Sequence, residues 1–293
     1  MQERAEYFKQ KIALYSMFIL GTGIINNGFK GNFGEVLAGF IFSLVLLLIL
    51  FPLVSNFSLK ISFFNTQNKL KEFFFIMFLL FISFVSLYII AENFKITIDF
   101  AEKLLLPETS KLITSLIFLI LIIYFGRRTK ETVLKFSYLI FLFAAFVIII
   151  FMLLMSKNYK SQNLEILTFP KLSNSIDSFF NYFKLVTLPS LLLPFYESFF
   201  FGKGSRKALI LGNAVGIFLL SICFLSSVLL FGATLCGKFS YAYAEAVSTV
   251  SIGRLFSRLD GYSYVIYFAS SLIKINICFS IIKASLGKIL RII

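Results

Sequence analysis

Apolar residues recur along this chain in long runs, and short segments that carry most of the charge separate them. The runs lie at residues 12–28, 35–54, 73–91, 110–125, 136–155, 184–201, 208–231 and 262–284. An apolar run of about 18 residues or more can cross a hydrocarbon core of roughly 30 Å as a helix. The pattern therefore predicts an all-α polytopic membrane protein, with about eight transmembrane helices in one domain over residues 1–293.

Two segments between these runs predict helices that do not cross. Residues 94–105, FKITIDFAEKLL, are amphipathic and too short to span, so we expect them at a membrane interface. The loop 233–261 has small residues and an amphipathic run, VSTVSIGRLFSRLD, which predicts a short helix folded over the extracellular mouth. Asp260 then falls in the first turn of the last span, where an acidic side chain is ordinary capping chemistry.

Composition supports the membrane class and excludes several chemistries. Hydrophobic residues make up 59% of the chain and the mean hydropathy is +0.91, more apolar surface than a soluble fold can cover. There is no histidine, and the three cysteines show no metal-binding spacing. No phosphate-binding glycine loop or nucleophile elbow occurs. We therefore predict no cofactor, no metal site and no enzymatic activity.

The net charge of +14 follows the topology of the spans and does not indicate a nucleic-acid partner. Sixteen of the 28 Lys and Arg residues, Lys9 and Lys11 among them, fall on the side that holds the N-terminus, mostly in short loops. Eleven fall on the opposite side, in longer loops that also hold acidic residues. The positive-inside rule then predicts that both termini are cytoplasmic.

The first span contains an interruption, LGTGIINNGF at residues 20–29. A glycine inside a helix costs about 1 kcal/mol relative to alanine. In lipid, unwound backbone persists only where it lines protein or a watery cavity. Gly21-Thr22-Gly23 therefore predicts a discontinuous helix whose exposed amides could hold a carboxylate. The other interpretation is a seam of small residues for close helix packing.

The sixth span carries a second interruption, TLPSLLLPFYESFFFGKG at residues 187–204. Pro189 and Pro194 both remove backbone donors. Glu197 follows within the apolar run, where a carboxylate needs a cavity or a partner unless it lies near a helix end. Interruptions in spans one and six are typical of an inverted-repeat transporter. The candidate ligand-binding residues are Gly21, Thr22, Gly23, Ile24, Phe195, Tyr196 and Glu197.

Lys274 lies near the middle of the eighth span. A buried lysine can neutralise, pair with a carboxylate or stand in for a coupling cation. We name Glu197 as its partner, so these two residues are the candidate ion-coupling or buried charges. The alternative is that Lys274 reaches an interface or faces a partner subunit.

Several short motifs, taken in order, resemble the B subunits of spore germination nutrient receptors, the GerAB-like germination permeases. The matching positions are Gly21 to Ile24, Leu106-Pro107-Glu108-Thr109, Gly126 and Arg128, Glu197, Phe231-Gly232, and Arg258-Leu259-Asp260. That family is similar to amino-acid/polyamine/organocation transporters. The resemblance covers nearly the whole chain, although no single motif is strong.

The resemblance implies a LeuT-like core that holds a small germinant, typically an amino acid, between helices one, three, six and eight. It also implies assembly with an A-type subunit and a lipoprotein C-type subunit in a bacterial cell membrane or spore inner membrane. Two departures stand out. Family members usually carry ten spans, so the second repeat would lack its last two helices. The stretch INNGFKGNFG also replaces an apolar, proline-bearing segment.

These observations favour a permease-like receptor subunit that binds a small amino-acid-type ligand and signals to partner subunits. Two alternatives stay open. The chain could be a stand-alone amino-acid or cation transporter that uses Glu197 or Lys274 in ion coupling. It could also be a truncated membrane scaffold that binds nothing. A transporter should show saturable uptake, and a receptor subunit should bind its ligand without sustained flux. A scaffold should do neither.

Overall fold

A computed structural model shows the fold and describes residues 2–23, 33–62, 69–105, 108–164, 171–201, 206–250 and 260–292. Within these ranges every regular element is a helix and no strand occurs, so the predicted all-α class is confirmed. Ile24, Leu106-Pro107 and Arg258-Leu259, which the sequence patterns single out, lie outside the described residues, as does the side chain of Thr22.

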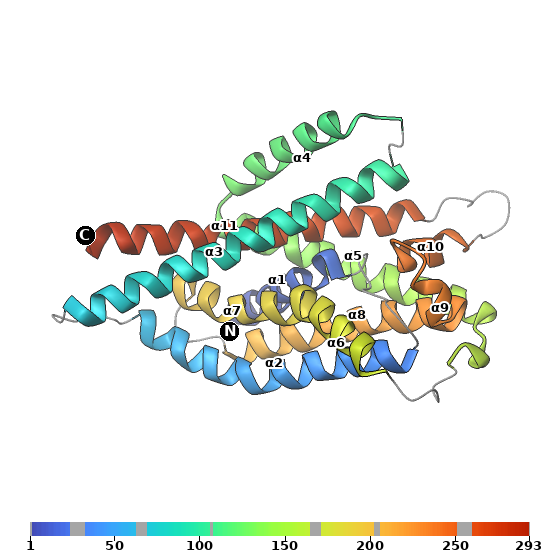
Figure 1. The fold of residues 1–293 in the computed structure, drawn as a ribbon. Coiled ribbons are helices and arrows are strands. Elements are labelled where there is room, and N and C mark those ends of the chain that lie inside the picture. The colour runs from blue at the N-terminus through green and yellow to red at the C-terminus, as the bar shows by residue number, and fades with distance from the viewer. Residues whose placement is uncertain are drawn as a thin grey trace.

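The described chain forms a bundle of long helices with short helices at one end (Figure 1). The α-helices are α1 (Gln2–Gly23), α2 (Phe33–Ser62), α3 (Lys69–Phe100), α4 (Lys111–Gly126), α5 (Lys130–Met155), α6 (Leu172–Tyr182), α7 (Leu188–Phe200), α8 (Arg206–Phe231), α9 (Ala233–Cys236), α10 (Ala242–Ser248) and α11 (Asp260–Ile292). The π-helices η1 (Ala101–Leu105) and η4 (Phe183–Thr187) extend α3 and join α6 to α7, and the 3₁₀ turns η2 (Ser156–Asn158) and η3 (Ser161–Leu164) follow α5.

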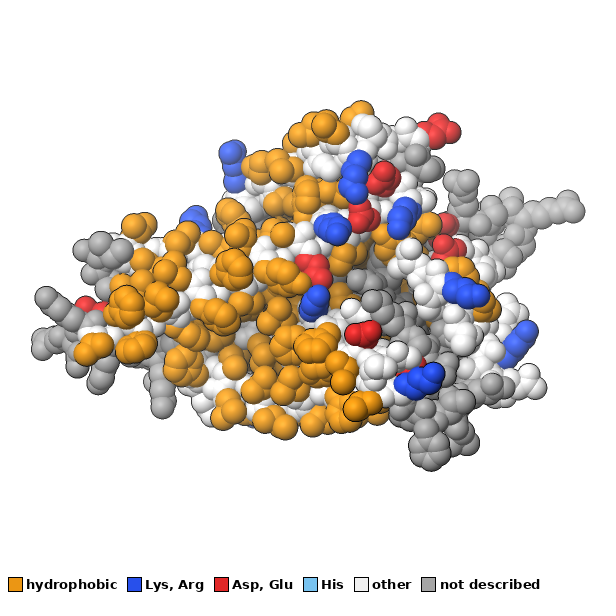
Figure 2. Space-filling view, in the orientation of Figure 1, with side chains coloured by type: hydrophobic (Ala, Val, Ile, Leu, Met, Phe, Trp, Pro, Cys, Tyr) orange, Lys and Arg blue, Asp and Glu red, His pale blue; other side chains and the backbone are white. Residues whose placement is uncertain are grey.

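In the described part of the chain, five helical segments are long and apolar enough to cross a membrane. They are Gly34–Ser58, Glu72–Leu105, Lys130–Asn158, Arg206–Phe231 and Asp260–Arg291. Helix α4 is apolar but has only 16 residues. Helix α1, which contains most of the first predicted span, begins in the charged sequence QERAEYFKQK, and the sixth predicted span begins within η4. Hydrophobic side chains cover most of the visible face (Figure 2), which is compatible with an integral membrane protein.

The expectation that residues 94–105 form a short segment of their own is wrong, because these residues continue α3 and form η1. Their position at a membrane interface stays a prediction. One polar position of the segment, Thr97, faces another helix. Thr97 is fully buried, and its hydroxyl lies 2.8 Å from the Ser271 hydroxyl and 3.0 Å from the Tyr267 hydroxyl on α11. A buried polar group needs such a partner. Thr97 thus contributes to the contact between α3 and α11.

Helix α1 occupies the centre of the bundle, where α5, α8 and α11 pack around it (Figure 1). From Ala13 to Leu20 every side chain has less than 9% of its surface exposed. A helix buried on all sides requires that any polar group it carries finds a partner inside the protein. The polar residues of α1 therefore mark the interior positions where specific contacts form.

Two glycines of α8 bring it against α1. A Cβ atom at Gly212 would lie 2.8 Å from the Ile12 carbonyl oxygen, and one at Gly216 would lie 2.9 Å from the Ser16 carbonyl oxygen. The Ser16 hydroxyl in turn donates a hydrogen bond of 2.9 Å to the Gly212 carbonyl. Glycines four residues apart are the usual means of close helix approach in membranes. They set the contact between these helices.

Helix α2 packs in a comparable way on α6 and η4. A Cβ atom at Gly39 would lie only 2.6 Å from the backbone nitrogen of Phe179. One turn further on, the hydroxyls of Ser43 and Thr187 are 2.7 Å apart, and both residues are fully buried. The second helix is therefore held to the sixth predicted span by a close backbone approach and a buried hydrogen bond.

The loop before the last helix contains short helices, as the sequence predicts in part. Helix α10 packs on α8 and α11, but it begins earlier than the amphipathic run that predicted it. Asp260 is in the first turn of α11, as expected. Its backbone carbonyl accepts a bond from the Ser263 hydroxyl, and its carboxylate accepts a 2.9 Å bond from the Tyr264 hydroxyl.

Contacts among helix ends gather several basic segments at one end of the bundle. The Lys130 ammonium donates a 3.5 Å hydrogen bond to the Phe200 carbonyl, which joins the start of α5 to the end of α7. The Tyr7 ring of α1 contacts the Phe201 ring, which follows α7. The Lys288 ammonium of α11 lies 4.7 Å from the Phe199 ring centroid. The basic segments around these residues therefore share one end, as the predicted topology requires. Which side of a membrane this end faces stays a prediction.

The close α1–α8 contact can be tested with Gly216→Val. The added side chain meets the Ser16 carbonyl, which cannot rotate away, so α1 and α8 must separate. Overpacking of this kind costs about 1–3 kcal/mol. Because the described cysteines, Cys223, Cys236 and Cys278, are all buried, a thiol-reactive fluorophore reports thermal unfolding directly.

The control is Gly287→Val on α11, where an added Cβ atom meets nothing within 4 Å. We expect the unfolding midpoint of Gly216→Val to fall by several degrees and that of Gly287→Val to stay near wild type. Equal midpoints for the two variants would contradict the close packing of α1 on α8.

Candidate functional site

The predicted break in the first span is confirmed at Gly21, whose backbone leaves the helical range with φ 7° and ψ −122°. The break lies between two neighbouring helices. A Cβ atom at Gly21 would lie 2.8 Å from Lys274 Cδ on α11, and one at Gly23 would lie 2.7 Å from Leu220 Cδ1 on α8. At both positions a Cβ atom would displace the end of a neighbouring side chain.

Lys274 lies against this break and is only 2% exposed. Its Nζ atom is 3.6 Å from the position of a Cβ on Gly21 and 5.8 Å from the centroid of the Phe18 ring. A backbone released from helical bonding offers carbonyl oxygens to a buried cation. The alternative that Lys274 reaches an interface does not fit its burial. The structure thus brings together a broken central helix and a buried ammonium.

Glu197 on α7 forms its ion pair with Lys11, and the predicted pair with Lys274 is wrong. The Lys11 Nζ atom lies 3.2 Å from Glu197 Oε1, and the Tyr15 hydroxyl donates a hydrogen bond to Glu197 Oε2. Lys11 and Glu197 are each 4% exposed and Tyr15 is fully buried. Burying both charges is tolerated only when they pair and bond in this way.

The reason for this error is the start of the first helix. Helix α1 begins at Gln2, so Lys11 lies along its length and not in a cytoplasmic segment before a span. Lys11 and Tyr15 are four residues apart and therefore share one face of α1. That face meets α7, which places both donors on the Glu197 carboxylate.

Aromatic rings enclose the outer end of this ion pair. The Lys11 ammonium lies 4.0 Å from the Phe201 ring centroid and 5.1 Å from that of Tyr7. Tyr196, which is 2% exposed, packs against Phe200 and Phe201 at centroid distances of 4.9 and 5.7 Å. Cation–π contact adds to the stability of a desolvated ammonium. Tyr196 thus contributes to the walls of the ion pair.

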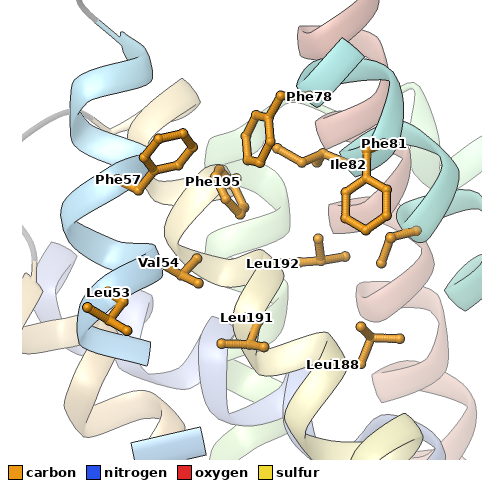
Figure 3. Close-up of a pocket in the computed structure, with 11 residues that line it drawn as sticks. Leu53, Val54, Phe57, Phe78, Phe81, Ile82, Leu188, Leu191, Leu192 and Phe195 are labelled. Atoms are coloured by element: carbon orange, nitrogen blue, oxygen red, sulfur yellow. The ribbon is translucent and has the colours of Figure 1, made fainter. Parts of the chain in front are cut away.

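Phe195 faces a different environment, an apolar cleft of ≈ 450 Å³ between α2, α3 and α7 (Figure 3). Its ring lies 5.7 Å from the Phe78 ring, measured between centroids. The cleft is lined by Leu53, Val54, Phe57, Phe78, Phe81, Ile82, Val85, Leu188, Leu191, Leu192 and Phe195. A cleft with only apolar walls suits a hydrocarbon chain and offers no polar group to a charged ligand.

The sixth span departs from α geometry close to its first proline. Residues 183–187 form η4, and Pro189 follows in the first turn of α7. Proline has no N–H to donate to the carbonyl four residues before it, which leaves the preceding turn free to widen. The Ser190 hydroxyl donates to the Val186 carbonyl at 2.6 Å and to Asn213 Oδ1 of α8 at 3.0 Å. Pro194, by contrast, lies inside α7 without interrupting it.

The candidate residues therefore divide into separate groups. Gly21 lies with Lys274, Gly23 lies against Leu220, Glu197 lies with Lys11 and Tyr15, and Phe195 lines the apolar cleft. Six residues separate Tyr15 from Gly21, which is a rise of about 9 Å along a helix. The two buried charge sites thus follow one another along α1.

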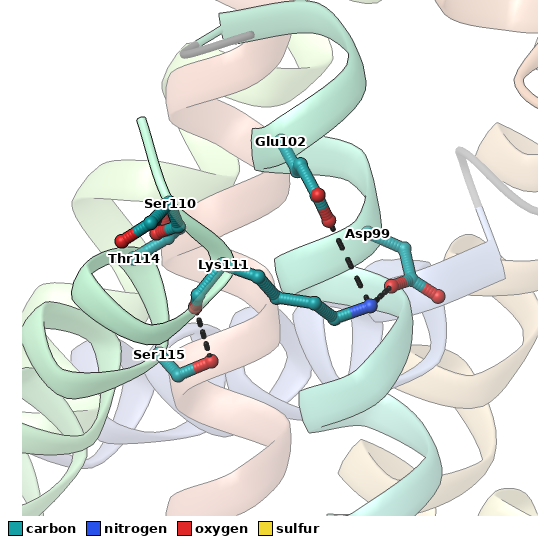
Figure 4. A network of polar contacts seen from close by, with 6 residues as sticks. All are labelled: Asp99, Glu102, Ser110, Lys111, Thr114 and Ser115. Carbon is teal, nitrogen blue, oxygen red and sulfur yellow. Dashed lines mark hydrogen bonds and ion pairs between the residues drawn. The ribbon is translucent and has the colours of Figure 1, made fainter. Parts of the chain in front are cut away.

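An exposed ion cluster joins the end of α3 to the start of α4 (Figure 4). The Lys111 ammonium lies 2.5 Å from Asp99 Oδ1 and 3.7 Å from Glu102 Oε2. Nearby, burial and these two carboxylates raise the pKa of Tyr241, before α10, to about 12. Its phenol is therefore neutral at physiological pH, and the Lys103 ammonium lies 5.7 Å from its ring centroid. This cluster fixes helix ends.

Sequence reasoning missed Lys11 and Tyr15 as site residues. The signal that could have found them is the pair of donors spaced four apart where the polar start of α1 gives way to its apolar part. Thr97 and Asn93 were missed for a related reason. The Asn93 amide donates a 3.0 Å bond to the Ser271 carbonyl, inside a run that hydropathy describes only as apolar.

The described residues contain no group of three or more His, Cys, Asp or Glu side chains that could hold a metal ion. Comparison with family models, curated proteins and solved structures finds no match for this chain. The interpretation of the site therefore depends on its own geometry and chemistry.

The Lys11–Glu197 pair can be tested with Lys11→Met and Glu197→Gln, made singly and together. Each single change leaves an uncompensated buried group, and breaking a buried pair costs about 3–5 kcal/mol. The double variant removes both charges, so we expect its loss of stability to be smaller than the sum of the single losses. Thermal unfolding followed by the thiol-reactive fluorophore measures all three.

Lys111→Met, which breaks the exposed pair with Asp99, is the control and should shift the midpoint least. Losses from Lys11→Met and Glu197→Gln that simply add would show that the two side chains do not interact.

Proposed function

We propose that this chain is a permease-like subunit of a spore germinant receptor, which binds a small amino-acid-type ligand beside the break in α1. The observation that carries the proposal is the interrupted central helix with a buried ammonium against it, at Gly21 and Lys274. Amide groups released at such a break carry partial positive charge. Together with an ammonium, they attract the carboxylate of an amino acid.

A LeuT-like inverted-repeat core is part of this proposal. In such a core a two-fold relation exchanges spans one and two with spans six and seven. Span one must then pack on span seven as span six packs on span two. Two contacts support this relation. Helix α8, the seventh predicted span, approaches α1 through Gly212, and α2 approaches α6, which leads into the sixth predicted span, through Gly39. In each pair the contact lies one to two turns before the irregular segment, which is Gly21 in α1 and η4 after α6.

The packing of α3 along α11 also supports the proposed core, because these are the third and eighth predicted spans. Asn93 and Thr97 of α3 hydrogen-bond to Ser271 of α11, one turn before Lys274. Helices three and eight are thus held together next to the break in helix one. This arrangement matches a ligand position between helices one, three, six and eight.

The fixed charges favour a receptor over a carrier. Lys274 supplies a basic group of the chain itself beside the break, in the role that a bound coupling cation has in a transporter. Glu197 is neutralised by Lys11 and bonded by Tyr15, which reduces its availability for ion exchange. We propose that occupancy is passed to A-type and lipoprotein C-type partner subunits in a bacterial cell or spore inner membrane, with cytoplasmic termini.

One observation favours a stand-alone transporter as a second candidate. The Tyr15 hydroxyl and the Lys11 ammonium both contact the Glu197 carboxylate inside the bundle. Such a chain of titratable groups is typical of proton-coupled carriers. In this second function, net uptake would depend on pH and on Glu197.

The proposal predicts saturable binding of at least one labelled amino acid to the purified chain in nanodiscs. Gly21→Val should weaken binding at least tenfold, because its side chain fills the space beside the Lys274 methylenes. Lys274→Met should do the same by removing the charge without adding volume. Gly287→Val, at an exposed position of α11, should bind like wild type. Equilibrium binding across a panel of the twenty amino acids measures this.

Each variant is first checked for a wild-type unfolding profile, so that a loss of binding can be attributed to the ligand site and not to unfolding. Uptake into proteoliposomes separates the two functions: a receptor subunit binds without sustained flux, whereas a transporter accumulates the ligand. Absence of binding across the panel from a well-folded sample would overturn the proposed ligand site and favour a scaffold.

A further inference from the structure

A second cavity opens between the end of α4 and the second half of α11. It has a volume of ≈ 520 Å³, and its lining combines basic side chains with apolar walls. The lining residues are Ile122, Ile123, Gly126, Arg127, Arg128, Ile275, Asn276, Phe279 and Lys283. No acidic residue is among them. The cavity is separate from Gly21, Lys274 and the Lys11–Glu197 pair.

Three cationic side chains, Arg127, Arg128 and Lys283, are exposed around this cavity. Among the described residues no carboxylate lies within 4.0 Å of any of them as an ion-pair partner. The Arg128 guanidinium stacks 4.1 Å from the centroid of the Tyr124 ring, which restricts its orientation. A cluster of three positive charges without a carboxylate partner attracts an anion with several acceptor oxygens.

The cavity is held in shape by a contact between its two helices. The buried Asn276 side chain on α11 donates a 3.1 Å hydrogen bond to the Phe125 carbonyl at the end of α4. Gly126 leaves the mouth open, since a Cβ atom there would meet nothing within 4 Å. The basic groups are thus placed around an existing opening.

The apolar walls identify the kind of anion. Ile123 and Phe279 are 49% and 51% exposed and line the same cavity as the basic side chains. A free phosphate ion would use only the charges, whereas a phospholipid would use both the charges and the apolar walls. We propose that this cavity binds an anionic phospholipid, with its phosphate between Arg127, Arg128 and Lys283 and an acyl chain along Ile123 and Phe279.

The test is native mass spectrometry of the delipidated full chain in detergent, titrated with phosphatidylglycerol or phosphatidylcholine. The variant Arg127→Gln/Arg128→Gln/Lys283→Gln removes the three charges. The matched control, Lys135→Gln/Arg206→Gln/Lys207→Gln, removes the same charge from exposed residues at the same end of the bundle that do not line the cavity. A basic residue near an anionic lipid is worth about fivefold in affinity, so three give a loss of tenfold or more.

We expect the wild type and the control to retain phosphatidylglycerol in preference to phosphatidylcholine, and the cavity variant to lose that preference. Ile123→Ser/Phe279→Ser should weaken retention of phosphatidylglycerol with all three charges intact. An equal loss in the control would overturn the proposal, because it would indicate a diffuse surface potential. The proposal would also be overturned if the wild type retained both lipids equally, or if inorganic phosphate displaced phosphatidylglycerol at a comparable concentration.

Discussion

The cost of burying charge on a central helix is the constraint on which the rest of this structure depends. Lys11 lies inside the bundle on α1, and an ammonium there is stable only with an anionic partner and further bonds. Glu197 supplies that partner from α7, and Tyr15 satisfies the second carboxylate oxygen. The pair thereby sets the rotation of α1 and the position of α7, because both donors must face one side.

Close backbone contacts transmit this placement to the other helices. Gly212 and Gly216 let α8 lie against α1, and Gly39 lets α2 lie against α6. Apolar helices in lipid gain little from hydrophobic burial against each other, so small residues and buried hydrogen bonds decide which helices associate. The contacts of Thr97 with Ser271 and Tyr267 have this role between α3 and α11. The break at Gly21 is therefore enclosed by helices with defined positions, which a ligand site requires.

Helix α4, at the surface of the bundle, makes its polar contacts at its two ends. Helix α4 is mostly exposed and apolar, and only its two ends make specific polar contacts. Lys111 pairs with Asp99 at its start, and Asn276 bonds to the Phe125 carbonyl near its end. The second contact forms one side of the basic cavity around Lys283. A lipid bound there would join α4 to α11, the helix that carries Lys274.

The sequence alone predicted the helical class, the break at Gly21, and Glu197 and Lys274 as the charges inside the apolar spans. These follow from local properties, since hydropathy, glycine and proline act through the residues next to them. It did not predict that Lys11 pairs with Glu197, that residues 94–105 continue α3, or that Phe195 lines an apolar cleft. Each of these depends on how a helix is rotated and which helix lies beside it. Apolar runs are nearly interchangeable in sequence, so only the tertiary packing of α1, α7 and α11 decided which charges meet.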